Sequence, residues 1–118
     1  MIRTLIVDDH SFFKKTLREF LEALDLVEVV GEAGDGEEAI AAAERLCPRL
    51  IIMDIRMPRL DGISACARVK AKAPELRVIL YSMESADIFA DRPAPGAYAC
   101  LSKDQLFDDL PRIIRQLS

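Results

Sequence analysis

Short aliphatic runs alternate along the chain with longer stretches in which apolar residues recur every three or four positions. The short runs have the length of β-strands, and the longer stretches have the period of amphipathic helices. The expected strands cover Leu5–Val7, Val27–Ala33, Leu50–Met53, Arg77–Tyr81 and Tyr98–Leu101. Strands that alternate with helices are typical of repeated β-α units, so the pattern predicts an α/β fold with a parallel sheet.

Three helices have recognisable boundaries in the sequence. The first is expected over Ser11–Leu24. Asp35 is placed as the N-cap of the second helix, with Glu38 at the capping-box position. Asp61 is placed as the N-cap of the third helix, which is expected to extend to about Lys72.

Prolines limit the two remaining helices. Pro111 would cost about 3 kcal/mol in the middle of a helix but little in its first turn. The last helix is therefore expected to begin at Asp108 or Asp109, with Asp108 as its N-cap. Between the fourth and fifth strands, only Glu84 to about Asp91 has helical character, and two prolines follow it. This fourth helix is expected to be short or irregular.

Polar residues stand at the points where the aliphatic runs stop. They are Asp8, Asp9, Asp54, Ser82 and Lys103. The carboxyl ends of parallel strands share one edge of the sheet, and open α/β sheets place their ligands outside that edge. These side chains are therefore expected to converge on one site.

The chemistry of the converging residues indicates a cation site that supports phosphoryl transfer. Carboxylates in contact repel one another by about 4 kcal/mol per pair at an effective dielectric constant of about 20, so such a cluster normally holds a cation. Oxygen ligands without sulfur favour Mg²⁺ or Mn²⁺ over zinc. Ionised Asp54 is the expected nucleophile, and Lys103 and Ser82 are expected to contact phosphoryl oxygens.

The residues at the first strand end have different expected roles. Asp9 could touch the metal directly while Asp8 acts through water, but the residue types alone do not decide between these arrangements. His10 is interpreted as a solvated or N-capping residue of the first helix rather than as a ligand.

Composition narrows the class of protein. The chain has 118 residues and a formal net charge of -4 at pH 7, which fits one domain without a basic patch for nucleic acid or an acidic membrane surface. Cys47, Cys66 and Cys100 form no C-x-x-C pair, which argues against a zinc site or a disulfide framework. No run approaches the ~20 apolar residues of a membrane helix. We therefore expect a cytoplasmic domain.

Four segments of the chain resemble the receiver domain of two-component response regulators. They are Ile6–His10, Met53–Gly62, Leu80–Met83 and Leu101–Asp104. The resemblance covers essentially all of residues 1–118 and implies a flavodoxin-like, five-stranded parallel sheet in the order 2-1-3-4-5 with helices on both faces. The Asp-Asp-His start and the Leu-Ser-Lys-Asp end look most like the subfamily with a LuxR-type helix-turn-helix. This chain contains no such module, so it would be one part of a longer regulator or a stand-alone receiver.

The resemblance also implies roles for the site residues. Asp54 would accept a phosphoryl group from a phosphohistidine of a sensor histidine kinase, and Ser82 and Lys103 would sense that group. The implied ligands of Mg²⁺ or Mn²⁺ are Asp8, Asp9, Asp54 and the backbone carbonyl of Arg56. The domain would act as a phosphoacceptor rather than as a turnover enzyme.

The chain departs from the receiver pattern at the surface that receivers commonly use for output. Receivers usually carry Tyr or Phe three residues before the lysine, where this chain has Cys100. Strand alternation places Tyr98 on the same side as Cys100, where it could partly substitute. This surface, formed by the fourth helix, fifth strand and fifth helix, could also mediate a homodimer. We expect intact phosphate chemistry and weaker coupling to output.

Other functions fit less well, and one alternative stays open. A phosphatase of the haloacid-dehalogenase kind needs Asp-x-Asp after the first strand, but this chain has Asp8-Asp9-His10. A flavin-binding electron carrier needs a phosphate loop there, and the two carboxylates would repel the flavin phosphate. A phosphorylation-independent interaction module on a receiver scaffold remains an alternative, because the output surface is unusual.

Overall fold

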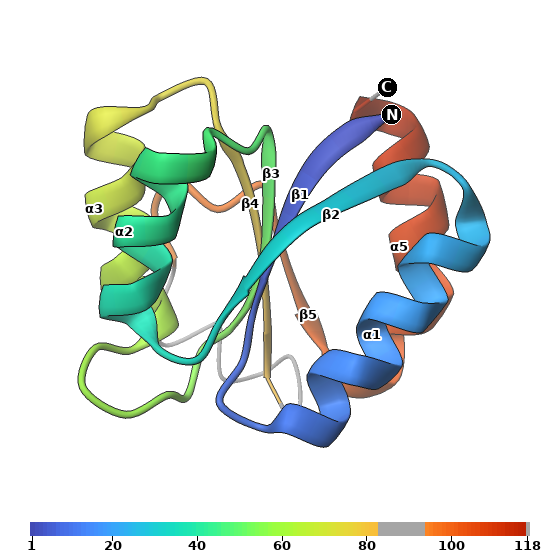
Figure 1. The fold of residues 1–118 in the computed structure, drawn as a ribbon, viewed down its shortest axis with the longest axis horizontal. Coiled ribbons are helices and arrows are strands. Elements are labelled where there is room, and N and C mark those ends of the chain that lie inside the picture. The colour runs from blue at the N-terminus through green and yellow to red at the C-terminus, as the bar shows by residue number, and fades with distance from the viewer. Residues whose placement is uncertain (83–93, 118) are drawn as a thin grey trace.

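A five-stranded parallel sheet forms the centre of the molecule (Figure 1). The computed structural model describes residues 1–82 and 94–117. The strands are β1 (Ile2–Val7), β2 (Val27–Ala33), β3 (Leu50–Asp54), β4 (Arg77–Ser82) and β5 (Ala99–Ser102). They lie in the order β2-β1-β3-β4-β5, and each neighbouring pair is parallel. The predicted fold class and strand order are confirmed.

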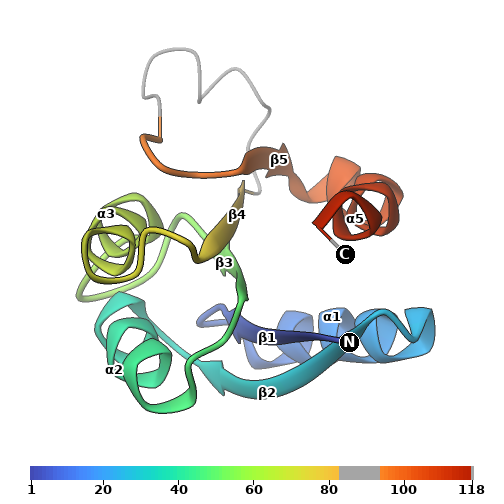
Figure 2. The same cartoon turned by 90° about the horizontal axis from the view of Figure 1, so that it is seen from above.

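The described helices form two layers, one on each face of the sheet (Figure 2). They are α1 (Ser11–Leu24), α2 (Gly36–Leu46), α3 (Gly62–Lys72) and α5 (Lys103–Leu117). Helices α1 and α5 cover one face, and α2 and α3 cover the other. The predicted arrangement of helices on both faces is confirmed.

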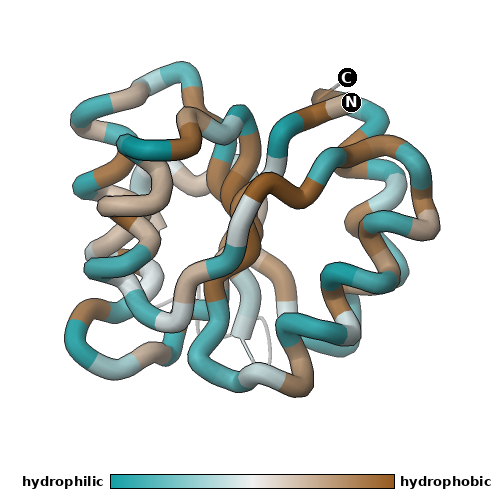
Figure 3. The backbone as a smooth tube through the Cα atoms, viewed as in Figure 1, coloured by the Kyte–Doolittle hydropathy of each residue, from teal (hydrophilic) through white to brown (hydrophobic). Residues whose placement is uncertain are grey.

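The central strands are apolar on both faces because each face is covered by helices. In β3, Ile51 and Met53 belong to the hydrophobic cluster on the α2 and α3 side, while Leu50 and Ile52 belong to the cluster on the α1 and α5 side. Figure 3 shows this apolar character along the centre of the sheet. Burial of each such side chain stabilises the fold by about 1.5–3 kcal/mol.

The predicted caps of two helices are confirmed. The Asp35 carboxylate accepts a hydrogen bond from the Glu38 backbone N–H at 2.8 Å at the start of α2. The Asp61 carboxylate accepts one from the Ser64 backbone N–H at 2.9 Å at the start of α3. Each cap satisfies a backbone donor that has no partner within its helix.

Helix α5 begins at Lys103, so the predicted start at Asp108 or Asp109 is wrong. Pro111 lies inside the helix, where it removes a backbone donor. The earlier start brings Leu106 onto the same buried stripe as Leu110, four residues later. Burial of this additional side chain offsets much of the cost of the proline.

A capping box explains where α5 begins. The Gln105 backbone N–H donates to Ser102 Oγ at 3.3 Å, and the Ser102 backbone N–H donates to Gln105 Oε1 at 3.3 Å. This reciprocal S-x-x-Q arrangement satisfies both donors and fixes the first turn. The S-x-x-Q motif at Ser102 therefore outweighs the preference of Pro111 for the first turn of a helix.

The short or irregular fourth helix predicted from Glu84 to about Asp91 lies outside the described residues. None of the described helices combines the length and the apolar character needed to cross a membrane.

Candidate functional site

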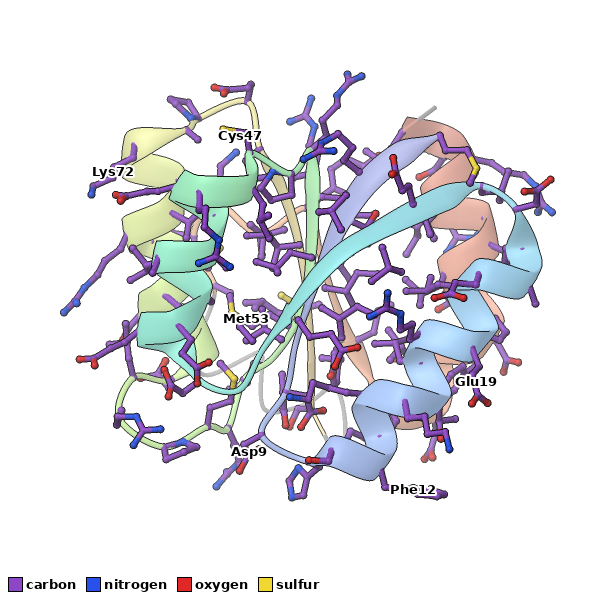
Figure 4. The ribbon with its side chains drawn as sticks, viewed as in Figure 1. Asp9, Phe12, Glu19, Cys47, Met53 and Lys72 are labelled. Carbon is purple, nitrogen blue, oxygen red and sulfur yellow. The ribbon has the colours of Figure 1, made fainter. Side chains whose placement is uncertain are left out.

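The polar residues at the strand ends lie at one edge of the sheet. Asp8 follows β1, Asp54 ends β3, Ser82 ends β4, and Lys103 follows β5 directly. All these strands are parallel, so their carboxyl ends point the same way. Figure 4 shows Asp9 at this edge of the molecule. The predicted convergence of these strand ends is present in the structure.

Three carboxylates and one imidazole form a compact group at this edge. One candidate ligand atom from each of Asp8, Asp9, His10 and Asp54 lies within 4.8 Å of all the others. Asp8 and Asp54 are buried, whereas Asp9 and His10 are exposed. Three convergent carboxylates provide the oxygen ligands that Mg²⁺ and Mn²⁺ prefer, so the residues fit the predicted cation.

His10 is exposed and occupies the N-cap position of α1, in agreement with its interpretation from the sequence. Its backbone is the N-cap of α1, but its side chain makes no capping hydrogen bond. Instead, His10 Nδ1 lies 3.0 Å from Asp8 Oδ1 and 3.2 Å from Asp9 Oδ1. The imidazole therefore lies at the open side of the acidic group.

The Asp8 carboxylate is buried and has partners on both oxygens. Oδ1 accepts a hydrogen bond from the His10 backbone N–H at 2.8 Å. Oδ2 accepts one from the Tyr81 hydroxyl at 2.6 Å and lies 3.8 Å from Lys103 Nζ. Burial, followed by the charge of Asp8, raises the pKa of Tyr81, so its hydroxyl stays protonated and donates. These contacts hold Asp8 in one orientation.

Asp54 lies in surroundings that disfavour its negative charge. It is only 2% exposed, and its Oδ1 accepts a hydrogen bond from the Arg56 backbone N–H at 3.2 Å. Burial and then the negative charge of Asp8 raise the pKa of Asp54 to about 6, although the Arg56 N–H and Lys103 act in the opposite direction. A cation or a proton would relieve this unfavourable charge.

The loop between β3 and α3 is fixed close to Asp54. The Gly62 backbone N–H donates to the Ile55 carbonyl at 2.8 Å. A Cβ atom on Gly62 would lie 2.2 Å from the Asp54 carbonyl oxygen, so only glycine permits this approach. Arg59, with a φ of 65°, donates through Nε to Asp35 Oδ2 at 2.7 Å. These contacts hold in place the loop that carries Arg56.

Lys103 rests between a carboxylate and an aromatic ring. Its side chain is 13% exposed, and its ammonium lies 4.0 Å from the centre of the Phe13 ring. The ion pair that the structure shows for Lys103 is with Asp8 Oδ2, at 3.8 Å. Ser82 is buried at the end of the neighbouring strand and pairs in register with Ser102. Ser82 and Lys103 therefore lie at the ends of β4 and β5, the two strands on one side of the strand that carries Asp54.

Comparison with known proteins identifies the family. The family model of the response regulator receiver domain matches residues 4–115 of the chain. The chain belongs to this family. The response regulator domain of Thermotoga maritima CheB superimposes with a TM-score of 0.86 and 36% identity, covering 98% of this chain and 95% of that one.

The longer relatives of this receiver domain include proteins named as enzymes and proteins named as transcriptional regulators. Protein-glutamate methylesterase/protein-glutamine glutaminase 1 of Geobacter sulfurreducens is 42% identical over 118 residues, which are 98% of this chain and 33% of that protein. Transcriptional regulatory protein PdtaR of Mycobacterium tuberculosis is 39% identical over 108 residues, which are 92% of this chain and 52% of that protein. The chain thus spans about a third to a half of these relatives. The LuxR-type subfamily is not singled out.

The two expected switch residues of this receiver domain do not share a side of the sheet. Cys100 packs against the hydrophobic cluster on the α2 and α3 side. Tyr98 precedes β5 and is 41% exposed; its hydroxyl lies 3.4 Å from Gln116 Oε1 of α5, and its ring faces the Arg77 guanidinium. The prediction that Tyr98 shares a side with Cys100 is wrong. Strand β5 begins at Ala99, so Tyr98 precedes the strand and does not follow its alternation of side chains.

Sequence reasoning missed two aromatic residues of the receiver site, Tyr81 and Phe13. The sequence predicts only that Tyr81 lies in the fourth strand and that Phe13 lies in the first helix. One indication was available, because a tyrosine with a buried hydroxyl needs a polar partner. That partner, Asp8, could not be identified without knowing how β1 and β4 are staggered across β3.

Proposed function

We propose that Asp54 is the phosphoacceptor of this receiver domain and that a sensor histidine kinase supplies the phosphoryl group as a phosphohistidine. One observation carries the proposal. Asp54 ends the central strand β3 and lies inside the acidic group, with candidate ligand atoms within 4.8 Å of one another. Membership of the receiver family supports the same role.

The transfer needs little chemistry from other side chains. An oxygen of ionised Asp54 attacks phosphorus, the phosphorus–nitrogen bond breaks, and its electron pair returns to the imidazole nitrogen. The product is an acyl phosphate on Asp54. Lys103 leaves Asp8 Oδ2 for the phosphoryl oxygens, and the Ser82 hydroxyl donates to another of them.

The acidic residues have a second role in this proposal. Asp8, Asp9 and Asp54, with the backbone carbonyl of Arg56, would hold Mg²⁺ or Mn²⁺, which would offset the charge of the incoming phosphoryl group. The hydrogen bond from the Arg56 N–H to Asp54 Oδ1 orients the nucleophile. Because His10 and Asp9 are exposed, the site is open to a partner on that side.

The proposed consequence of phosphorylation is a population shift. Phosphorylation adds about two negative charges, and Lys103 and Ser82 move toward them. In the cytoplasm, this shift would act on an output domain or a second copy of the chain through the fourth helix predicted from the sequence, β5 and α5. Transcription through a LuxR-type module is the output that the Asp8-Asp9-His10 and Leu101–Asp104 segments favour.

One observation favours a second candidate function. Cys100 replaces the aromatic residue expected three positions before Lys103, and Tyr98 lies on the other side of the sheet. A receiver scaffold that no longer couples phosphorylation to output would act as a phosphorylation-independent interaction module. Such a domain would bind its partner equally well with and without phosphate.

Intact-mass analysis after incubation with acetyl phosphate and Mg²⁺ tests the proposed function. We expect one added phosphoryl group on the wild type and none on Asp54→Asn. Asp25→Asn is a matched control, because Asp25 lies away from the site with a φ of 57° that asparagine accepts readily. An unmodified wild type, or an Asp54→Asn variant that still gains the mass, would contradict the assignment.

A further inference from the structure

Tyr81 places a hydroxyl group inside the acidic site from a fully buried position. Its exposed fraction is 0%, and its oxygen lies 2.6 Å from Asp8 Oδ2. We propose that Tyr81 is a positioning residue that fixes the Asp8 carboxylate for binding of a divalent cation. This inference rests on the proposed function and assigns a role to a residue outside the expected ligand set.

The backbone of Tyr81 places it between the two acidic strand ends. Tyr81 pairs in register with Asp54, and its carbonyl accepts a hydrogen bond from the Ile55 N–H at 2.9 Å. Its side chain reaches past β3 to Asp8, which follows β1. One residue thereby links the position of Asp8 to that of Asp54.

The hydroxyl group completes the restraint on Asp8. The His10 backbone N–H binds Oδ1 at 2.8 Å, and the Tyr81 hydroxyl binds Oδ2, so both carboxylate oxygens are held. A hydrogen bond from a neutral hydroxyl to a carboxylate is short and strong in a buried site. Hydrogen-bonded partners of metal-binding carboxylates commonly change metal affinity by about 10–100-fold when they are removed.

The Tyr81 ring is held independently of its hydroxyl. The Phe13 ring packs against it with a centroid separation of 5.4 Å, and the Lys103 ammonium lies 5.8 Å from the Tyr81 ring centre. Phenylalanine at this position would keep these ring contacts and remove only the hydrogen bond to Asp8. Tyr81→Phe is therefore a specific test of the hydroxyl group.

Calorimetric titration with Mg²⁺ tests the inference on three proteins: the wild type, Tyr81→Phe and Tyr98→Phe. Tyr98 is the matched control, because it is exposed and its hydroxyl faces Gln116. We expect Tyr81→Phe to bind Mg²⁺ about tenfold more weakly than the wild type and Tyr98→Phe to bind it equally well. Equal or tighter binding by Tyr81→Phe would overturn the role of Tyr81 and leave the proposed function intact.

The wild-type titration separates the two proposals. A wild type that binds no Mg²⁺ would overturn the metal site of the proposed function and the inference with it. Urea unfolding of each variant in EDTA checks that Tyr81→Phe retains a cooperative transition, so that weaker binding is not a consequence of unfolding.

A second measurement uses the wild type alone and does not depend on the folding of a variant. Tyrosine labelled with ¹³C at Cζ gives one NMR signal for Tyr81 and one for Tyr98, the two tyrosines of the chain. We expect the Tyr81 signal to move during the Mg²⁺ titration, with the same saturation as binding, and the Tyr98 signal to stay. A Tyr81 signal that is unchanged at saturation would contradict the linkage.

Discussion

At the scale of single residues, Asp54 combines burial with the need to carry a charge. Desolvation and Asp8 both disfavour the ionised form, and the contacts from Arg56 and Lys103 offset only part of this effect. The same surroundings keep water away from the carboxylate and gather oxygen ligands around it. The residue that we assign as phosphoacceptor is thus one whose negative charge needs a counter-ion.

Replacing Asp54 with asparagine should stabilise the cation-free domain at neutral pH. The raised pKa of about 6 means that the protonated carboxyl stabilises the fold fully below about pH 4 and that this stability is lost as the pH rises through about 6. Asparagine resembles the protonated form at every pH. Urea unfolding in EDTA should show Asp54→Asn more stable near pH 7 by up to about 3 kcal/mol, with the difference vanishing near pH 4. A pH-independent difference would contradict this explanation.

Gly62 should tolerate no side chain, although it lies in a helix. A Cβ atom there would meet the Asp54 carbonyl oxygen at 2.2 Å and Ile55 Cα at 2.9 Å. We expect Gly62→Ala to lower the free energy of unfolding by about 1–3 kcal/mol and to reduce phosphorylation of Asp54 by moving its backbone. Gly34→Ala is the control, because its added Cβ would meet only the flexible end of Glu38 at 3.2 Å. Equal stability of the two variants would contradict the proposed close approach.

At the scale of elements, α5 connects the site to α1, the other helix on the same face of the sheet. It begins at Lys103, and its Phe107 ring packs edge-on against Phe20 of α1 at a centroid separation of 5.0 Å and against Phe13 at 5.8 Å. Because Lys103 also lies over the Phe13 ring, a movement of Lys103 toward phosphate would alter contacts between α1 and α5. Such a movement would act on the helices of the face away from Cys100.

Replacing Pro111 with alanine should stabilise α5. The proline lies inside a helix whose buried stripe continues on both sides of it. Alanine restores the backbone donor, and the gain of up to about 3 kcal/mol is reduced by about 1 kcal/mol because the unfolded chain becomes more flexible. Urea unfolding should show a net gain of about 1–2 kcal/mol, whereas Arg112→Ala, at an exposed position of the same helix, should have little effect. A loss of stability in Pro111→Ala would show that the proline fits the helix better than alanine.

At the scale of the whole molecule, most of the architecture could be predicted from the sequence. The aliphatic runs such as Leu50–Met53 mark the strands, and Asp35 and Asp61 mark helix starts that the structure confirms. Parallel strands separated by helices then require the strand-end residues to share one edge of the sheet. The location of the acidic site follows from that rule.

The parts that could not be predicted depend on competition or on three-dimensional register. The predicted start of α5 is wrong because the capping box at Ser102 and the burial of Leu106 outweigh the cost of Pro111. The predicted side of the sheet for Tyr98 is wrong because β5 begins at Ala99, one residue after Tyr98. The contact between Tyr81 and Asp8 joins β4 to the end of β1, which are not neighbouring strands. The sequence pattern of either strand alone therefore does not predict it.

Binding of Mg²⁺ at the acidic site should stabilise the whole domain. A ligand that binds only the folded state at a hundred times its dissociation constant raises the free energy of unfolding by about 2.7 kcal/mol. Urea unfolding of the wild type should show this increase over the value in EDTA. Asp9→Asn, which removes one exposed carboxylate from the group, should show a smaller increase. A wild type with the same stability in Mg²⁺ and EDTA would contradict the site.

The central claim is that Asp54, and not another aspartate of the acidic group, carries the phosphoryl group. The most direct measurement is borohydride reduction after treatment with acetyl phosphate and Mg²⁺, followed by peptide mapping, because reduction converts an aspartyl phosphate to homoserine. We expect homoserine at Asp54, with Asp8 and Asp9 unchanged. Homoserine at Asp8 or Asp9, or at none of the three, would contradict the claim.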